Sequence, residues 1–410
     1  MVSISKPRGT RDFPPEEMEK RRAIEKKMRE VFKKYGYEEV STPTFEHLDL
    51  FTLKSGEGVI EETYAFSDKS GRMLALRPEL TAPVMRFYVE KLQMRAKPLK
   101  LFYFGNCFRY DRPQSGRYRE FWQMGCELIG SDQPEAIAEL VALAYNVLKE
   151  AGLNNIVLRI GNLDFLRSFI DEMGIEDKGE VMRLIDKEEY EKLEEMIGGN
   201  EYYEEFMEVL REKEISYLKK FFDEKGIKKF EDVLAWLSHF DVPYNIDLSI
   251  ARGLDYYVGI VFEIDAPSLG AEKQICGGGE YKLISLLGGK EVPTAGFALG
   301  FDRILLALEK EGFVFPPSEK PIYILPIGDK MRKEAISLAT ELRKKGMKVE
   351  MDLMRRSIQK SLQYADKKGV KKVIILGEDE WKKGTISIKD METGEQKEVK
   401  KEELLVHLGK

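Results

Sequence analysis

The amino-acid sequence predicts an α/β protein of two domains, the first of the α+β type around an antiparallel sheet. Three observations predict this fold class. Two strand-like segments flank a polar loop near residues 108–127, strands and helices alternate regularly after residue 320, and a proline-rich stretch at Phe313–Lys320 separates the two patterns. The 410 residues, of which 43% are hydrophobic, are enough to build two or three cores.

The N-terminal part begins with a long amphipathic helix, expected over residues 16–35. Pro14 and Pro15 precede this helix and Gly36 follows it, which is typical of helix boundaries. The next strand pattern is interrupted by Pro43, and a proline inside a strand indicates a sheet edge or a bulge. An edge of this kind is completed by a partner subunit or is an ordinary sheet margin, and these residues support both readings equally.

A hairpin with its turn at residues 68–71 follows, and then a helix that starts near Pro83. Glu79 and Thr81 come at the end of the second hairpin strand and alternate onto one side. The Glu79 carboxylate is either a favourable charge at the helix N-terminus or a ligand for an ammonium group. Taken alone, its position favours the first interpretation.

The segment Phe108–Glu127 is the main evidence for a binding site. Its sequence predicts two strands joined by the loop RPQSGRY. Side chains alternate along a strand, which places Arg109 and Asp111 on one face. On the return strand one face carries Arg119, Phe121, Gln123, Gly125 and Glu127. A hairpin built only for packing would have one apolar face. This mixture of guanidinium, carboxylate, amide and aromatic groups predicts a ribbon that binds a ligand.

Residues 163–240 have a strongly charged helical pattern and are expected to form an insertion within the first domain. Strand patterns resume afterwards, with a break at Arg252–Asp255 beside Tyr256 and Tyr257. These residues indicate either a binding site or a buried tyrosine pair. The run Gly277–Gly279 destabilises a strand and favours close approach of a ligand to the backbone.

Arg303 is expected in the first turn of a helix that follows Gly300. A positive charge is unfavourable there, so an anion held between this arginine and the helix end is expected. The sequence has no GxxxxGK[ST] loop, no GxGxxG after a strand and no GxSxG elbow. The candidates for binding phosphate are therefore three arginines on separate elements, Arg109, Arg252 and Arg303, which would suit a nucleoside triphosphate.

Charge is distributed unevenly along the chain. From Pro321 onward there are 21 Lys and Arg against 15 Asp and Glu, which leaves 45 basic and 57 acidic residues before it. A basic C-terminal domain indicates a polyanionic partner, although a lysine-rich solvated surface has the same composition. No apolar run long enough to span a membrane and no secretory signal are visible, and the three cysteines have no paired spacing, so a cytoplasmic protein without a structural zinc site is expected.

These motifs resemble those of the class II aminoacyl-tRNA synthetases, and the chain is similar to the histidyl-tRNA synthetase family in particular. FRYDRPQSGRYREFWQ resembles the second class motif, GFALGFDRIL the third, and the first helix with EEVSTPTFE the first, which forms the dimer interface. ARGLDYYVGIVFE and CGGGEYKL resemble the two stretches peculiar to the histidine enzymes. The resemblance implies a class II catalytic domain over residues 1–320, with the insertion inside it, and an anticodon-binding domain over residues 321–410.

The resemblance also implies a homodimer that uses ATP and Mg²⁺ to activate histidine as histidyl-adenylate and transfers it to the 3′ end of tRNA(His). It implies that ATP is bound by Arg109, Asp111, Phe121 and Arg303. The residues implied in catalysis are Arg252 and Arg109. Histidine would be bound by Glu79, Thr81, Gln123, Glu127, Tyr256 and Tyr257. The implied tRNA contacts are Gln114 and Arg119.

Several positions depart from the usual family pattern. Asp111 and Asp302 replace glutamates, Trp122 replaces a frequent histidine, and Glu280 and Lys282 stand where the family more often has a basic and an acidic residue. The alternative is an inactive paralogue that acts as regulatory subunit of ATP phosphoribosyltransferase. Such a paralogue generally lacks the C-terminal domain and the catalytic arginine stretch, and both are present here. A synthetase for another amino acid is disfavoured by the two histidine-type stretches.

Overall fold

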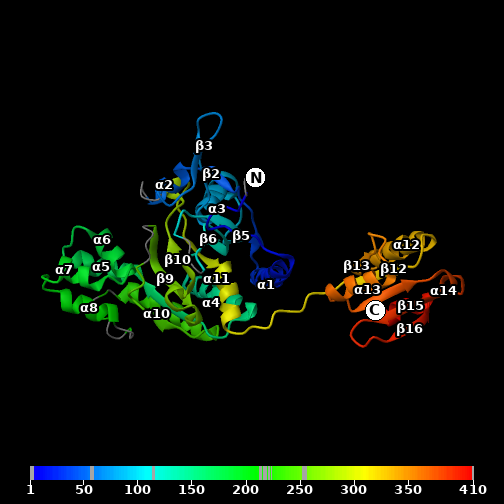
Figure 1. Ribbon diagram of the computed structural model, residues 1–410. Coiled ribbons are helices and arrows are strands. Elements are labelled where there is room, and N and C mark those ends of the chain that lie inside the picture. The colour runs from blue at the N-terminus through cyan, green and yellow to red at the C-terminus, as the bar shows by residue number, and fades with distance from the viewer. Residues whose placement is uncertain are drawn as a thin grey trace. The chain divides into compact units, whose positions relative to one another are not determined.

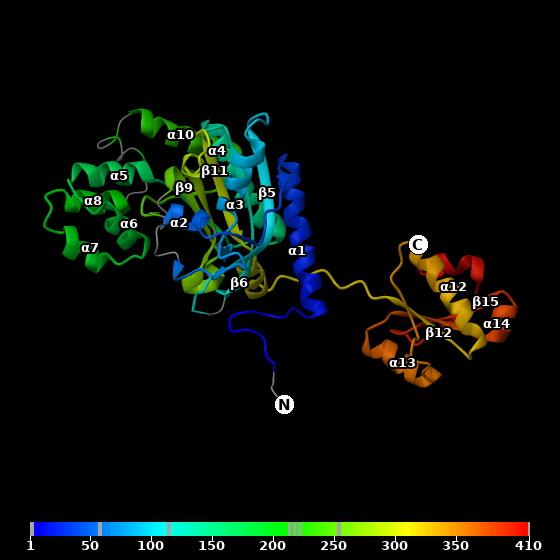
Figure 2. The ribbon, with the colours of Figure 1, turned by 90° about the horizontal axis from the view of Figure 1, so that it is seen from above.

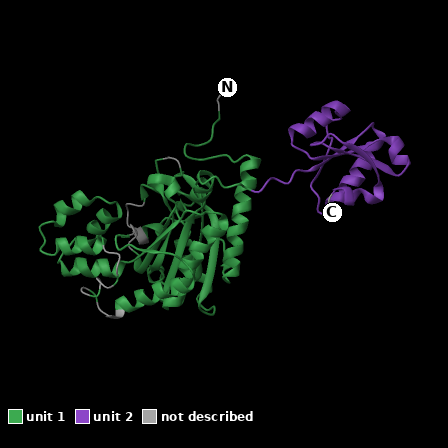
Figure 3. Ribbon diagram, turned by 90° about the horizontal axis from the view of Figure 1, so that it is seen from below, with its two compact units in different colours: residues 1–315 green, residues 316–410 purple. Residues whose placement is uncertain are grey.

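The computed structural model describes residues 4–55, 60–112, 116–211, 215, 219, 222, 224–251 and 256–408. The chain divides into two compact units, Met1–Phe315 and Pro316–Lys410, which Figure 3 colours separately. Each unit contains its own large sheet. The mixed α/β class predicted from the sequence is therefore confirmed.

Unit 1 is built around an eight-stranded sheet with the strand order β1-β5-β6-β11-β10-β9-β7-β8 (Figure 1). The six central strands pair antiparallel, as predicted, whereas the short edge strands β1 and β8 pair in parallel with their neighbours. The strands are β1 (Glu38–Glu39), β5 (Leu99–Phe108), β6 (Glu120–Ile129), β7 (Val157–Asn162), β8 (Asn245–Ile246), β9 (Tyr257–Asp265), β10 (Gln274–Tyr281) and β11 (Thr294–Gly300).

Helices lie on both faces of the large sheet (Figure 2), and its side chains alternate between two buried cores. Phe102 and Met124 are buried in a core shared with the helices of one face, whereas Leu101 and Tyr103 are buried in the core of the other face. The first face is covered by α1 (Pro15–Lys34), α4 (Pro134–Ala151) and α11 (Phe301–Lys310). The second face is covered by α2 (Asp49–Ser55) and α3 (Thr81–Phe87), and a π-helical turn (Tyr88–Leu92) extends α3.

The predicted strand around Pro43 is divided into two short strands that belong to different sheets. Pro43 lies between β1 and β2 (Phe45–His47), and a proline has no amide hydrogen to donate to a strand ladder. The three-stranded sheet β2-β4-β3 also contains β3 (Ala65–Ser67) and β4 (Met73–Leu76). The Asp68 carboxylate accepts hydrogen bonds from two backbone amides in the tight turn between β3 and β4, where the sequence predicts it.

The insertion between β7 and β8 consists of helices and turns in its described residues (Figure 1). Its apolar side chains join the core of the sheet, because Phe165 and Phe230 are buried in the same cluster as Phe262 of β9. The helices are α5 (Leu163–Glu172), α6 (Lys178–Asp186), α7 (Tyr190–Ile197), α8 (Tyr203–Arg211) and α10 (Glu224–His239).

Unit 2 has the predicted βαβαβ pattern followed by a hairpin. The strand order is β13-β12-β14-β15-β16, in which β12 pairs in parallel with β13 and β14, and the last three strands are antiparallel. None of the helices in the described part of the chain has the length and hydropathy of a membrane span. The elements are β12 (Ile322–Pro326), α12 (Lys330–Lys344), β13 (Val349–Met351), α13 (Ile358–Lys367), β14 (Lys372–Leu376), α14 (Glu378–Lys382), β15 (Thr385–Asp390), β16 (Gln396–Lys400) and α15 (Leu404–Leu408).

Candidate active site

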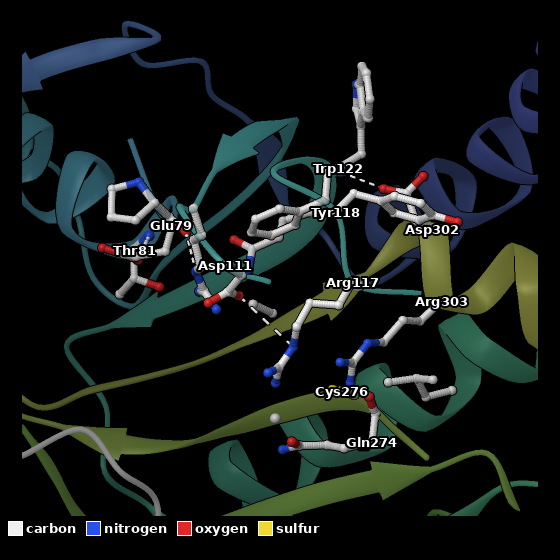
Figure 4. Close-up of a pocket in the computed structure, with 18 of the residues that line it drawn as sticks. Glu79, Thr81, Asp111, Arg117, Tyr118, Trp122, Gln274, Cys276, Asp302 and Arg303 are labelled. Carbon is white, nitrogen blue, oxygen red and sulfur yellow. Dashed lines mark hydrogen bonds and ion pairs between the residues drawn. The ribbon is translucent and has the colours of Figure 1, made fainter. Parts of the chain in front are cut away.

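A pocket with a cavity volume of about 420 Å³ opens on the α3 side of the large sheet (Figure 4). Residues from β6, β10, the start of α3 and the start of α11 line it, so it collects segments that are far apart in the sequence. Nine of the side chains singled out in the sequence line this pocket: Glu79, Thr81, Arg109, Asp111, Phe121, Gln123, Tyr256, Tyr257 and Arg303.

Arg303 is fixed by three different acceptors. Its guanidinium donates hydrogen bonds to the Gln274 carbonyl at 2.7 Å, to the Glu272 carboxylate at 2.5 Å and to the Gly116 carbonyl at 3.3 Å. Arg303 lies in the first turn of α11, as predicted. However, part of its guanidinium is already hydrogen-bonded to a carboxylate, where the sequence predicted a bound anion. A phosphate arriving here would therefore share Arg303 with Glu272 or displace that carboxylate.

Positive charge is concentrated at this end of the pocket. Figure 4 shows the guanidinium groups of Arg117 and Arg303 on the same side. Burial lowers the pKa of Arg303; Glu272 raises it, and the nearby charges of Arg117 and Arg109 lower it further. An arginine keeps its proton despite such a shift, so the arrangement provides fixed positive charge for an anion.

Arg109 lies at the end of β5 and is oriented by backbone and ring contacts. Its Nε donates a hydrogen bond to the Pro78 carbonyl at 3.0 Å, and its guanidinium carbon lies 5.2 Å from the centroid of the Phe121 ring. The Asp111 carboxylate lies 3.9 Å from the Arg117 guanidinium. Phe121 thus offers an aromatic ring next to the arginines, as a nucleotide base would require.

Glu127 lies behind the pocket wall and is completely buried. Its carboxylate accepts hydrogen bonds from the Tyr103 hydroxyl at 2.9 Å and the Tyr281 hydroxyl at 2.5 Å. Burial raises the pKa of Glu127 to about 8, and the two tyrosine hydrogen bonds counteract this effect. Thr81 connects the pocket to this group, because its hydroxyl lies 3.4 Å from the Tyr103 hydroxyl.

Glu79 caps α3, as its position alone favoured. Its carboxylate accepts hydrogen bonds from the backbone amides of Thr81 at 2.5 Å and Ala82 at 3.0 Å. It also lines the pocket, so it can face a ligand while it stabilises the helix end. The two interpretations of Glu79 are thus compatible.

Tyr256 and Tyr257 close another side of the pocket and are both 94% buried, with 6% of their surface exposed. Their rings stack with centroids 4.8 Å apart, so the tyrosine pair and the binding site proposed from the sequence are the same feature. Of the glycine run, Gly277 lines the pocket. Gly278 is explained by sheet packing instead, because a Cβ there would lie 2.5 Å from the Gly296 carbonyl oxygen.

Asp302 connects the third motif to two distant segments. It is buried, and its carboxylate accepts hydrogen bonds from Arg21 at 2.8 Å, Arg11 at 2.6 Å and the Trp122 backbone amide at 2.8 Å. The Arg11 guanidinium also stacks on the Tyr118 ring at 3.4 Å. The N-terminal segment therefore supports the wall of the pocket, which the sequence pattern alone did not indicate.

One further candidate, Arg119, lies outside the pocket. It donates to the Asp111 carbonyl at 3.2 Å and its guanidinium lies 4.0 Å from the Tyr110 ring. Arg252 and Gln114 lie outside the described residues. The sequence reasoning missed Arg117 and Glu272, although Arg117 is a basic residue within the loop already proposed to bind a ligand.

Family models match both parts of the chain. The model described as histidyl-tRNA synthetase matches residues 9–304, and the model of an anticodon binding domain matches residues 321–409. The histidine–tRNA ligases of Archaeoglobus fulgidus and Methanocaldococcus jannaschii are 47% and 46% identical to the chain. Each of these two matches covers 98% of this chain and 99% of the relative.

Solved structures agree with these matches. Apo histidyl-tRNA synthetase of S. aureus has a TM-score of 0.80 at 33% identity, and the match covers 100% of both chains. A Bacillus halodurans structure described as an ATP phosphoribosyltransferase regulatory subunit/histidyl-tRNA synthetase has a TM-score of 0.78 at 25% identity. That match covers 89% of this chain and 97% of the other. The regulatory-subunit alternative is therefore not better supported than the synthetase.

Proposed function

The chain belongs to the histidyl-tRNA synthetase family, and on this premise we propose that it activates histidine with ATP and charges tRNA(His). In the first step the histidine carboxylate attacks the α-phosphorus of ATP, which forms histidyl-adenylate and releases pyrophosphate. In the second step a hydroxyl at the 3′ end of the tRNA attacks the acyl carbon and AMP leaves. The observation that carries the proposal is one pocket with arginines at one end and, behind its wall at the other end, a carboxylate bound by tyrosine hydroxyls.

We assign the arginine end of the pocket to ATP. Arg109 would bind the α-phosphate, and Arg303 would bind the γ-phosphate in place of part of its contact with Glu272. Phe121 would stack on adenine and Asp111 would accept from its amino group. Because adenylation is an in-line displacement, positioned positive charge supplies most of the acceleration.

We assign the closed end to histidine. Gln123, Tyr256 and Tyr257 line the pocket near the wall that contains Glu127. A cationic or N–H donating ligand favours the ionised form of a buried carboxyl group. Glu127 would therefore accept a hydrogen bond from the imidazole, and Glu79 and Thr81 would bind the ammonium group. An amino acid without a ring N–H would offer Glu127 no hydrogen bond beyond those from Tyr103 and Tyr281, which gives specificity.

Mg²⁺ would enter with ATP as part of the substrate. In the described residues no group of three or more His, Cys, Asp or Glu is arranged to hold a metal ion. Magnesium bound to a nucleotide needs only one or two protein carboxylates, because phosphates and waters supply its other ligands. Glu272, beside Arg303 and Arg117, is the carboxylate that best fits this role. The ion would neutralise phosphate charge.

The remaining roles follow from the family and lie partly outside the described residues. We propose that Arg252 stabilises the α-phosphate in the transition state and that Gln114 contacts the tRNA acceptor end. Arg119 is held between Tyr110 and the Asp111 carbonyl, so its proposed contribution at the acceptor end is to orient the loop. Residues 321–410 would bind the anticodon, in keeping with their basic charge. We place this reaction in the cytoplasm.

We also propose a homodimer formed through the first motif. Two large apolar side chains on one face of the small sheet are exposed, Phe45 by 53% and Phe66 by 42%, and they pair with Leu76 and Leu74 of β4. Apolar residues gathered on a sheet surface indicate a surface that another chain covers. Sedimentation equilibrium would give twice the chain mass, whereas a monomer would contradict this assignment.

ATP–pyrophosphate exchange tests the proposed activity. The purified chain is incubated with ATP, labelled pyrophosphate and one amino acid at a time. Exchange is expected with histidine and not with the other amino acids. Exchange that does not depend on histidine would contradict the substrate assignment.

A further inference from the structure

The strand that carries Tyr257 contains a bulge next to the pocket. Gly279 of β10 pairs with Val261 of β9, but the next residue, Glu280, pairs with Val258. Two residues of β9, Gly259 and Ile260, are therefore left out of this ladder. Bulges redirect a strand and are frequent beside functional sites.

Two carboxylates bind the backbone amides that the bulge removes from the ladder. Glu280 Oε2 accepts a hydrogen bond from the Ile260 amide at 2.9 Å, and the Asp164 carboxylate accepts one from the Gly259 amide at 3.0 Å. Gly259 has φ 54°, and a Cβ there would lie 2.5 Å from Glu280 Oε2. The bulge is thus shaped around the Glu280 carboxylate.

The same carboxylate is tied to the helical insertion. Glu280 Oε1 accepts a hydrogen bond from Lys229 Nζ at 2.5 Å, and only 10% of the Glu280 side chain is exposed. Lys229 belongs to α10 and Asp164 to α5, so both ends of the insertion reach this bulge. A partly buried, charge-assisted pair of this kind holds its partners in one geometry.

The bulge lies next to the aromatic wall of the proposed histidine site. Tyr257 lies two residues before Gly259, and Tyr281, which donates to Glu127, follows Glu280 directly. The Tyr281 ring also packs edge-on against Tyr256 at 5.7 Å, and the Lys282 amide donates to the Tyr256 carbonyl at 2.9 Å. A shift of the bulge would therefore move three tyrosines at once.

We infer that Lys229 and Glu280 are positioning residues, through which the helical insertion sets the geometry of the histidine site. This inference rests on the proposed function. It gives the insertion a role in amino-acid binding, and it explains the acidic residue at position 280 by its lysine partner on α10. Arg109 and Arg303, at the proposed ATP end of the pocket, lie after β5 and on α11, and Arg303 contacts β10 at Gln274, the opposite end of that strand from Glu280.

The test compares Lys229→Met, which removes the charge, with Lys229→Arg, which keeps it. In histidine-dependent ATP–pyrophosphate exchange, Lys229→Met is expected to raise KM for histidine about tenfold, equivalent to about 1.4 kcal/mol. KM for ATP should stay within about twofold, because the arginines are untouched. Lys229→Arg, which keeps the charge, should have a KM for histidine close to that of the wild type. The matched control is Lys192→Met, which breaks an exposed ion pair elsewhere in the insertion.

Amide hydrogen exchange gives a second readout that needs no substrate. Lys229→Met is expected to increase exchange in a peptide covering residues 257–262, and Lys192→Met is not. Unchanged exchange there, or equal changes in KM for both substrates, would overturn the positioning role. If wild-type protein shows no histidine-dependent activity, the proposed function fails, whereas the amide measurement still decides whether Lys229 holds the bulge.

Discussion

The hydroxyl of Tyr281 donates a hydrogen bond of 2.5 Å to the carboxylate of Glu127, although 154 residues separate the two in the chain. The hairpin strand β6 and the glycine-bearing strand β10 are brought together by β11, which pairs with both. The contact explains how two motifs recognised separately in the sequence form one binding site. We therefore expect a substitution of Glu127 to disturb the proposed amino-acid site.

Glu127→Gln should separate histidine binding from ATP binding. Glutamine preserves the shape of the side chain but removes the charge, and losing one member of a buried charged hydrogen bond costs about 2–5 kcal/mol. We expect KM for histidine to rise by about 100-fold and KM for ATP to change little. Steady-state exchange assays measure both constants. Tyr281→Phe, which removes only one donor, should have a smaller effect, and equal effects on both substrates would contradict the assignment.

The stability of unit 1 should fall as pH rises towards 8. Burial raises the pKa of Glu127 from 4.5 in the unfolded chain to about 8, so the folded protein binds one more proton between these values. The group therefore contributes full stability below pH 4.5 and loses it as pH rises through 8. One extra proton corresponds to a slope of about 1.4 kcal/mol per pH unit. Urea unfolding of wild type and Glu127→Gln is measured at several pH values. The difference between their free energies of unfolding should change with pH with this slope, and a difference that does not depend on pH would refute the prediction.

Arg303→Lys should impair ATP use almost as strongly as Arg303→Met. The guanidinium reaches three acceptors at once, and an ammonium group cannot reproduce this planar fork. We expect KM for ATP to rise by about 100-fold in both variants, with KM for histidine little changed. Exchange assays at varied ATP concentration provide the test. Lys310→Met, at the other end of α11, is the matched control and should behave as wild type.

Asp302→Asn should destabilise unit 1. The carboxylate is the shared partner of Arg11 and Arg21, and removing one member of a buried ion pair costs about 3–5 kcal/mol because the other charges stay buried. Asparagine can still accept the hydrogen bond from the Trp122 amide. The loss in free energy of unfolding therefore measures the effect of removing the negative charge. Chemical unfolding measures the free-energy change. Lys33→Met breaks an exposed pair on α1 and should cost less than about 1 kcal/mol.

The sequence predicted local features well because periodicity and turn residues act locally. The long first helix, the antiparallel ribbon and the alternating C-terminal unit are all confirmed. The predicted break at Pro43 is confirmed, but the sequence did not show that the strands on its two sides belong to different sheets. Pairing partners far apart in the chain decide such details, and a single sequence does not contain them.

The site was predicted less completely, for the same reason. Arg109, Phe121 and Gln123 follow from strand alternation, and all three line the pocket. The partners of Arg303 and Asp302 could not be predicted from the sequence, because Glu272 and Arg11 approach them only after the chain has folded. Glu127 was assigned to the ligand face by alternation, yet it lies one layer deeper, behind hydroxyl groups from β5 and β10.

The most direct test of the central claim is charging of tRNA(His) by the purified chain with labelled histidine and ATP. The structure predicts acid-precipitable histidyl-tRNA that accumulates only when histidine, ATP and tRNA(His) are all present. The contradicting result is no charged tRNA under these conditions together with stimulation of an added ATP phosphoribosyltransferase, which would identify a regulatory subunit instead.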